Sequence, residues 1–304
     1  GFKNPWASIC DELVTGYGNA SKYNNSDKNA TNVSFHRYGD CYKAIRQANI
    51  FLQKAHVITA GGTQGDELLE PELKRYQANA RFMRAFYHYL LFEQYGPIII
   101  VGDKVYEATE SQDMSRNSVD EVVEYLDKEL LASADELSQE PIIDENYRAE
   151  PTKGVALAVR AKMWVYAASP LLNGGFNEAL NIANPDGKKL FPIADAAKWE
   201  RARQACADFI NYANENNRYE LYYAAPEKNG VVNPEKSVYE LFQKYTKEII
   251  WATATADWGG LDGDAFDRRI VPRTEQNGLG STGVTQELVD AVSYTHLTLP
   301  TNRE

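Results

Sequence analysis

A tryptophan beside an aspartate in a glycine-bounded stretch is the pair of residues with the most specific chemistry in this sequence. Trp258 follows Asp257 and is itself followed by Gly259-Gly260. An indole ring offers a flat apolar plate, and a neighbouring carboxylate accepts hydrogen bonds from hydroxyl groups. The pair therefore suits a ring-shaped ligand that carries hydroxyls, such as a sugar. Because large aromatic side chains are usually buried, the alternative is that Trp258 fills the interface between two lobes.

Aromatic residues near the start of the chain could contribute to the same chemistry. Tyr17 and Tyr23 lie in a stretch that is rich in Asn, Ser and Gly and has no helical period, and Trp6 precedes it. Binding residues concentrate on loops that a rigid scaffold holds, so these three are predicted as further sugar contacts. Trp164 and Trp199 fall in helical patterns instead and are predicted to lie in the core.

Three nearby aspartates form a weak candidate for a metal site. Asp262, Asp264 and Asp267 could supply the hard oxygen ligands that Ca²⁺ prefers. Their spacing does not match an EF-hand, and an acidic turn is the favoured interpretation.

No motif in the sequence predicts a catalytic centre. The four histidines lack the HxxxH and HExxH spacings, and the three cysteines are widely separated. The stretch 278–283 is rich in glycine but lacks the lysine of a phosphate-binding loop. The carboxylates Glu121, Glu124 and Glu129 are predicted to lie on the solvated face of one helix. We therefore predict no catalytic residue, no enzyme activity and no cofactor.

Composition excludes several classes of protein. The net charge of −11 and the pI near 5.0 argue against binding to a nucleic-acid backbone. This charge fits a neutral or cationic ligand, or simply solubility. A hydrophobic content of 43% indicates a globular chain, and no run approaches the roughly 18 apolar residues of a membrane span.

Helical periodicity organises most of the chain and would position these loops. Apolar residues recur at helical spacing over 38–59, 72–95, 118–138, 152–168 and 196–214. Gly61-Gly62 is expected to stop the first helix, and Gly96 to cap the second. Ser118 with Glu121 has the spacing of a capping box, and Thr152 is predicted as an N-cap.

The second of these helices is apolar on nearly all sides, which predicts a helix buried among several others. Small residues in the fourth helix predict close approach of its neighbours. After residue 218, short segments alternate with Gly- and Asp-rich loops. The expected fold is mainly α: a tetratricopeptide-like helical-repeat lobe over 1–218, and an irregular, loop-rich lobe that begins at 219–292.

Five segments, taken in order, resemble the SusD/RagB family. They are YGDCYKAIRQANIFLQKA, YQANARFMRAFYHYLLFEQYGPIII, MSRNSVDEVVEYLDKELLASADEL, PTKGVALAVRAKMWVYAASPLLNGG and TQELVDAV. The resemblance covers residues 38–292. Residues 293–304 resemble translated adapter sequence and are predicted to be a non-native tail.

The resemblance implies a function without catalysis. SusD-like proteins are surface lipoproteins of the outer membrane in Bacteroidetes-type bacteria. They capture oligosaccharides or polysaccharides and deliver them to a SusC-like TonB-dependent transporter. In this family a tetratricopeptide-type lobe docks on the transporter, and a less regular lobe carries the ligand site. The lipid anchor is expected upstream of Gly1, and some members of such a family could bind peptides.

Two other functions stay open from the residues alone. A helical-repeat scaffold would bind a protein partner through its helices. An α-helical glycoside hydrolase would require two carboxyl groups about 5–10 Å apart on either side of the scissile bond.

Overall fold

The computed structural model describes residues 10, 12–15, 29, 36–59, 67–107, 109–110, 113–226, 230–241, 243–252, 271–275 and 278–296. The chain divides into two compact units. One comprises residues 37–254 and is called the helical body here. The other comprises residues 1–36 together with 255–304. The predicted domain boundaries, 1–218, 219–292 and 293–304, stay predictions.

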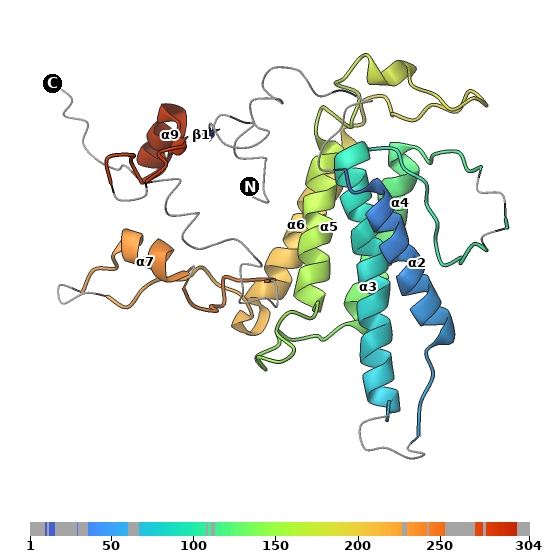
Figure 1. Cartoon of the computed structure of the whole chain (residues 1–304), viewed down its shortest axis with the longest axis horizontal. Coiled ribbons are helices and arrows are strands. Elements are labelled where there is room, and N and C mark those ends of the chain that lie inside the picture. The colour runs from blue at the N-terminus through green and yellow to red at the C-terminus, as the bar shows by residue number, and fades with distance from the viewer. Residues whose placement is uncertain are drawn as a thin grey trace. The chain divides into compact units, whose positions relative to one another are not determined.

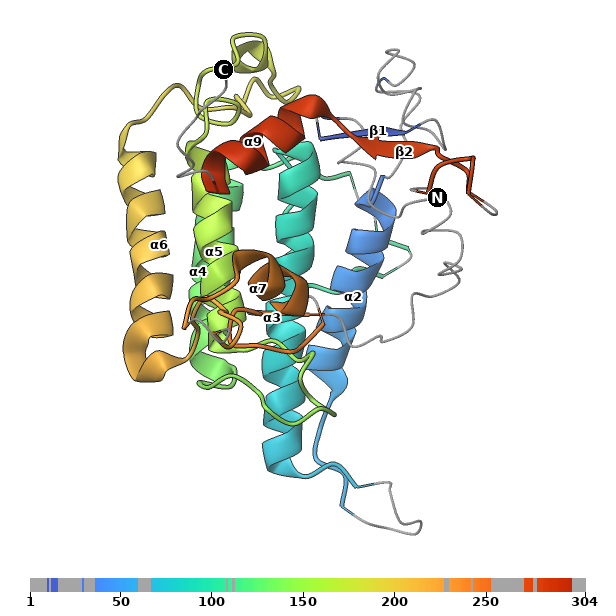
Figure 2. The same ribbon diagram turned by 90° about the vertical axis from the view of Figure 1, so that its left-hand side faces the viewer.

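Long helices stand side by side in the helical body (Figures 1 and 2). They are α2 (Tyr38–Lys54), α3 (Glu70–Tyr95), α4 (Val119–Glu136), α5 (Lys153–Ala168) and α6 (Ala197–Asn214). Each helix packs on the one that follows it in the chain. This arrangement confirms the mainly α, helical-repeat fold that the periodicity predicts.

The helix with the most evenly apolar surface, α3, lies in the middle of this array. It contacts α2, α4 and α5. Phe82, Leu91 and Phe92 on α3 are completely buried. A helix that packs against three others must carry apolar side chains on more than one face, and this requirement accounts for the weak amphipathicity of the segment.

Small side chains allow α5 to approach its neighbours closely. Ala156 and Ala167 are completely buried, and Trp164 beside them is 2% exposed. A side chain at Gly154 would place its Cβ 2.6 Å from the ring of Tyr219. Any larger residue at this position in the first turn of α5 would therefore require the Tyr219 ring to move.

The predicted helix ends are largely confirmed. Ser118 accepts a hydrogen bond from the Glu121 amide at 3.4 Å, and the Glu121 carboxylate accepts one from the Ser118 amide at 2.8 Å, which completes the capping box. Thr152 Oγ1 accepts from the Val155 amide at the start of α5. Gly96 ends α3 with a positive φ of 65°, a conformation that glycine adopts without steric cost.

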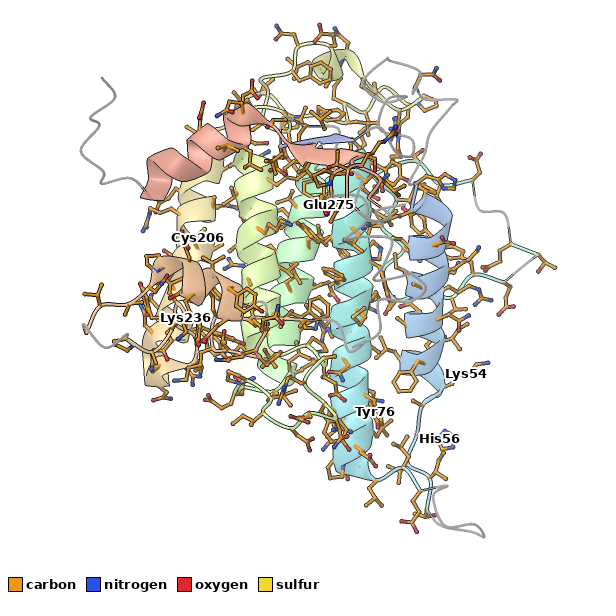
Figure 3. The ribbon with its side chains drawn as sticks, turned by 60° about the vertical axis from the view of Figure 1, so that its left-hand side comes forward. Lys54, His56, Tyr76, Cys206, Lys236 and Glu275 are labelled. Carbon is orange, nitrogen blue, oxygen red and sulfur yellow. The ribbon has the colours of Figure 1, made fainter. Side chains whose placement is uncertain are left out.

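The first helix is shorter than predicted. It ends at Lys54 rather than at 59, before Gly61-Gly62 is reached. Beyond Lys54 the chain becomes extended, and Ile58 exchanges two backbone hydrogen bonds of 3.0 Å with Leu68. β-Branched residues at 57–59 favour this extended pairing over another helical turn. Figure 3 labels Lys54 at the end of α2 and His56 just beyond it.

Two side chains lie where the sequence did not predict them. Trp199 was expected in the core but is 52% exposed, because α6 is the last long helix of the array and packs on α5. Glu129 was expected on a solvated face but is only 8% exposed, because α4 turns it onto α3. Cys41 on α2 is buried, and Cys206 on α6 is half-buried (Figure 3).

Shorter elements complete the description. The helical body also contains the 3₁₀ turns η2 (Ala179–Asn181) and η3 (Glu215–Asn217) and the helix α7 (Pro234–Leu241). In the other unit, β1 (Leu13–Thr15) pairs antiparallel with β2 (Thr282–Val284), and α9 (Gln286–His296) follows. The sequence predicted no strand near the N-terminus, because three residues are too few to show a period. Among the described helices, none has the length and apolar character needed to cross a membrane.

Candidate functional site

The residues that the sequence singles out lie outside the described part of the chain. Trp258, Asp257, Tyr17, Tyr23 and Trp6 are all in this group, so their predicted sugar contacts stay predictions. The aspartates at 262, 264 and 267 lie outside it as well. Across the described ranges, no group of three or more His, Cys, Asp or Glu side chains could hold a metal ion.

A pocket in the helical body forms between the start of α2 and the segment that joins α3 to α4. We call it the α2 pocket, and it encloses about 300 Å³. Its lining is Tyr38, Gly39, Tyr42, Arg46, Ile99, Val101, Lys104, Tyr106 and Met114. Residues 38, 42 and 46 share a wall because side chains four apart lie on one face of a helix.

Three tyrosines give the α2 pocket flat apolar surfaces with polar edges. Tyr38 is 39% exposed, and its ring centroid lies 4.7 Å from that of Tyr42 and 5.4 Å from that of Tyr95. Tyr106 lines the opposite side, on the joining segment. Half-exposed aromatic rings held by other rings are suited to stacking on a ligand, because little side-chain entropy remains to be lost.

Hydrogen bonds fix the ring of Tyr42 and that of Tyr95, which packs behind Tyr38. The Tyr42 hydroxyl donates to the Ile99 carbonyl at 2.8 Å and accepts from the Ile99 amide at 3.1 Å. Burial raises the pKa of Tyr42, so its hydroxyl stays protonated. The Tyr95 hydroxyl accepts from the Arg37 and Tyr38 amides at 3.0 and 3.2 Å. Tyr95 thereby supplies the N-terminal cap that no side chain at Arg37 provides to α2.

Two cations line the α2 pocket, and none of the described residues in its lining carries a carboxylate. Lys104 Nζ lies 4.2 Å from the centroid of the Tyr106 ring and 3.4 Å from Glu110 Oε1. Arg46 is exposed on α2 and has no ion-pair partner among the described residues. The pocket thus combines aromatic surfaces with a local positive charge.

Backbone contacts hold the joining segment, which forms the far wall. Asn49 Nδ2 donates to the carbonyls of Gly102 and Lys104, both at 3.0 Å. Asn117 Oδ1 accepts from the Ile100 amide at 3.0 Å. These bonds tie residues 100–104 to α2 at one end and to the start of α4 at the other.

A buried polar network lies directly behind this wall. We call it the Arg84 network, and its members are Asn49, Arg84, His88 and Glu129. Arg84 donates to Glu129 Oε2 at 2.8 Å and to Asn49 Oδ1 at 3.2 Å. Each of the four side chains is at most 8% exposed. The charges in this network are matched within the fold, so it serves structure.

His88 is held in its neutral form. Nδ1 lies 2.8 Å from the Arg84 carbonyl, and Nε2 lies 3.4 Å from the Val101 amide. These partners assign the proton to Nδ1 and leave Nε2 to accept. Burial lowers the pKa of His88 to about 4. Protonation would remove the acceptor that the joining segment uses.

A second pocket, larger but chemically different, lies at the other end of the helical body. It encloses about 570 Å³ and is lined in part by Arg148, Arg218, Tyr245 and Lys247. Its cations are already paired: Arg218 binds both oxygens of Glu140 at 2.6 and 2.9 Å, and Lys247 donates to the Asn217 carbonyl at 3.0 Å. We therefore assign the candidate site to the smaller α2 pocket, where a cation remains available.

The sequence did not predict this pocket. The sequence predicted residues 38–46 only as part of the first helix, in which Tyr42 is partly buried. The spacing of Tyr38, Tyr42 and Arg46 was the available signal, since it places two aromatic residues and one cation on a single helix face. The opposite wall comes from more than 50 residues further along the chain.

Comparison with known proteins gives one family and several related structures. The family model described as "Starch-binding associating with outer membrane" (SusD-like_3) matches residues 8–165. A search of curated proteins finds no match. The solved structure of BT4246 is 29% identical, with a TM-score of 0.61 over 75% of this chain and 40% of that one.

Two more distant structures share the fold. A SusD-like protein, BF3747 from Bacteroides fragilis, is 20% identical, with a TM-score of 0.61 over 89% of this chain and 44% of that one. A SusD superfamily protein from Bacteroides thetaiotaomicron is 15% identical, with a TM-score of 0.57 over 96% of this chain and 57% of that one. In each case this chain spans less than two thirds of the relative's length.

Proposed function

This chain belongs to the SusD-like family, and from that premise we propose that it captures glycans at the outer membrane without transforming them. The observation that carries the proposal is the α2 pocket, which lies in the helical body and not in the less regular lobe where the family resemblance implies the ligand site. The pocket presents half-exposed tyrosine rings. The family to which the chain belongs is described as starch-binding. Sugar rings present C–H faces to aromatic planes and hydroxyls to polar edges, which is the combination of surfaces found in this pocket.

The absence of a carboxylate pair supports binding over catalysis. Hydrolysis of a glycosidic bond uses two carboxyl groups, one on each side of the bond. No Asp or Glu is among the described residues that line the α2 pocket. A ligand in this pocket would meet aromatic rings and cations, which can hold a sugar but cannot supply the acid and base of hydrolysis.

The loop residues form a second part of the same proposal. Trp258 with Asp257, and Tyr17, Tyr23 and Trp6, have the residue types that stack on sugars and accept their hydroxyls. They would supply glycan contacts in addition to those of the α2 pocket. Multivalent contact of this kind suits a polysaccharide, because successive sugar rings can engage successive aromatic plates.

Membership of the family supports a proposal for the partner and the location. We propose a surface lipoprotein that delivers its glycan to a SusC-like TonB-dependent transporter. Sequencing across the native locus tests this part. A lipidation cysteine upstream of Gly1 and an adjacent gene for a TonB-dependent barrel are expected. A locus that has neither would overturn the delivery step and favour the helical-repeat scaffold.

Titration calorimetry with a panel of polysaccharides tests glycan capture by the α2 pocket. Replacing Tyr38 or Tyr106 by Ala removes one stacking plate, so we expect affinity to fall roughly 10-fold, the factor equivalent to about 1–1.5 kcal/mol. Tyr239→Ala is the matched control, since Tyr239 is 68% exposed on α7 and lies outside the pocket lining. Equal affinities for all three variants would exclude the α2 pocket as the glycan site.

A further inference from the structure

We propose that the α2 pocket selects acidic glycans, that is, sugars that carry a carboxylate or a sulfate group. This inference rests on the proposed glycan capture and names the class of ligand. The shared chemistry is an anionic group attached to a pyranose ring. The ring would stack on Tyr38 or Tyr106, and the anion would meet Arg46 and Lys104.

The described pocket lining is positively charged, whereas the whole chain is negatively charged. The chain has 43 acidic residues and 32 basic ones. Among the residues that the structure describes, the α2 pocket nevertheless has two cations in its lining and no acid. A neutral or cationic ligand was the expectation from the net charge, but interactions beyond about 10 Å are largely screened, so the local charges decide.

The acids nearest in sequence do not neutralise Arg46. Asp40 is six residues earlier on α2, and its carboxylate pairs with Lys43 at 3.4 Å. Glu110 pairs with Lys104 at 3.4 Å and accepts from the Glu107 amide. Arg46 is therefore the cation in this lining without a paired carboxylate among the described residues. A planar guanidinium with unused donors matches a carboxylate or sulfate oxygen pair.

The second cation is held in place before any ligand arrives. The Lys104 carbonyl accepts from Asn49, and the Lys104 ammonium lies over the Tyr106 ring. Asn49 in turn contacts Arg84 in the closed network behind the wall. Because the backbone at Lys104 is fixed, less conformational entropy is lost when an anion binds than would be lost by a free loop.

The competing interpretation is that both cations serve solubility. Exposed lysine and arginine side chains are usually solvated, and Lys104 over Tyr106 could be a structural cation–π pair. In that case the pocket would bind a sugar with and without its acidic group equally well. The two interpretations differ in one measurable ratio, which is the affinity for the acidic glycan over that for its neutral form.

The test uses the full chain with matched pairs of polysaccharides. One arm compares uronate-containing glycans with their carboxyl-reduced forms, and the other compares sulfated glycans with their desulfated forms. We expect at least one acidic member to bind roughly 10- to 100-fold more tightly than its neutral partner, as a charge-assisted hydrogen bond provides. The preference should shrink as salt is added, because the charges are solvent-accessible.

Variants assign the preference to the pocket. Arg46→Gln and Lys104→Gln should each remove most of the preference while affinity for the neutral form changes little. Lys43→Gln is the matched control, because Lys43 is also a cation on α2 but does not line the pocket. Glu110→Gln should strengthen acidic-glycan binding, since it releases Lys104 from its carboxylate partner while the amide can still accept from Glu107.

Each of the other outcomes would overturn a specific part of the proposal. Equal binding of acidic and neutral forms that Tyr38→Ala weakens would sink the acidic preference and leave glycan capture standing. Acidic binding that persists in the Arg46→Gln and Lys104→Gln variants would exclude this pocket as its source. No binding to any glycan in either arm would overturn both the capture and the preference. The arm that succeeds names the anion as carboxylate or sulfate.

Discussion

The Arg84 network and the α2 pocket use the same kinds of side chain for opposite purposes. Arg84 is buried, and its charge is matched by Glu129 at 2.8 Å. Arg46 lies on the rim of an open pocket and has no such partner among the described residues. A cation whose partner belongs to the fold stabilises that fold, whereas a cation left open at a pocket is available to a ligand.

Asn49 connects the two regions. Its carbonyl oxygen accepts from Arg84 on the buried side, and its amide donates to the backbone at 102 and 104 on the pocket side. The Arg84 network therefore holds in place the backbone that forms one wall of the α2 pocket. If this comparison is correct, damage to the network should reduce stability first, and damage to the pocket should reduce ligand affinity first.

The largest expected effect comes from breaking the buried ion pair. Glu129→Gln leaves the Arg84 guanidinium buried without a countercharge, which should cost about 3–5 kcal/mol of unfolding free energy. Urea denaturation measures the change. Glu124→Gln is the matched control on the same helix: its carboxylate is 58% exposed and pairs with Arg201, so the loss should stay below about 1 kcal/mol. Equal losses in both variants would contradict the assignment of the network to stability.

Replacing both partners sharpens the same point. Arg84→Met combined with Glu129→Leu removes the charges together, and most of the stability lost in Glu129→Gln should return. If the double variant is less stable than the single one, the ion pair contributes more than the cost of its burial.

The second effect is a dependence on pH. The pKa of His88 is about 4 in the folded chain against 6.5 when unfolded, so the unfolded state binds more protons between these values. Stability should therefore be complete above pH 6.5 and fall by about 3 kcal/mol as the pH drops toward 4. Urea denaturation of the native chain and of His88→Gln across this window isolates the contribution. Parallel curves would show that His88 is not the titrating group.

The third effect tests the connection between network and pocket. Asn49→Ala should cost about 1–3 kcal/mol, because it leaves the buried Arg84 guanidinium without one acceptor and two partly buried carbonyls without donors. It should also weaken glycan binding by releasing Lys104. Gln53→Ala is the control one turn later, since Gln53 donates to the Asp103 carbonyl from an exposed position. Loss of stability without any loss of affinity in Asn49→Ala would mean that the two regions are independent.

The last effects come from two glycines, one in the lining of the open pocket and one packed against Tyr219 in the first turn of α5. Gly39 lines the open pocket, has no heavy atom within 4 Å of a built Cβ, and does not have a positive φ. Gly39→Ala should therefore raise stability by about 0.5 kcal/mol through helix propensity. Gly154→Ala should lower it by about 1–3 kcal/mol, because the new Cβ would lie 2.6 Å from Tyr219. Thermal unfolding measures both, and the same sign for both would contradict the packing at α5.

Local patterns in the sequence predicted most of the helical body. Apolar periodicity placed α3 to α6 within a few residues of their bounds, because a helix that packs on others must present apolar faces at a period of 3.6. The caps at Ser118 and Thr152 were predictable because both partners of each cap lie within three residues. The end of α2 was not, since the Ile58–Leu68 pairing that extends the chain joins residues ten apart.

The burial of Glu129 and the exposure of Trp199 could not be predicted from their helices alone. Each helix has a face that looks polar or apolar by itself, but the neighbour that covers that face comes from elsewhere in the chain. Arg84 meets Glu129 across 45 residues, and α6 has its long-helix neighbour, α5, on one side. Pairings of this kind are long-range, and a single sequence carries no record of them.

The sequence by itself determined the family, the order of the helices and the lack of a catalytic motif, because these depend on residue types and on spacings within single helices. Only the tertiary structure decided which charged side chains are paired inside the fold and which line a pocket without a carboxylate partner among the described residues. The α2 pocket exists because a helix face at residues 38–46 meets a segment at 99–114. Charge matching is a property of distances in space, and those distances arise only when the helices pack.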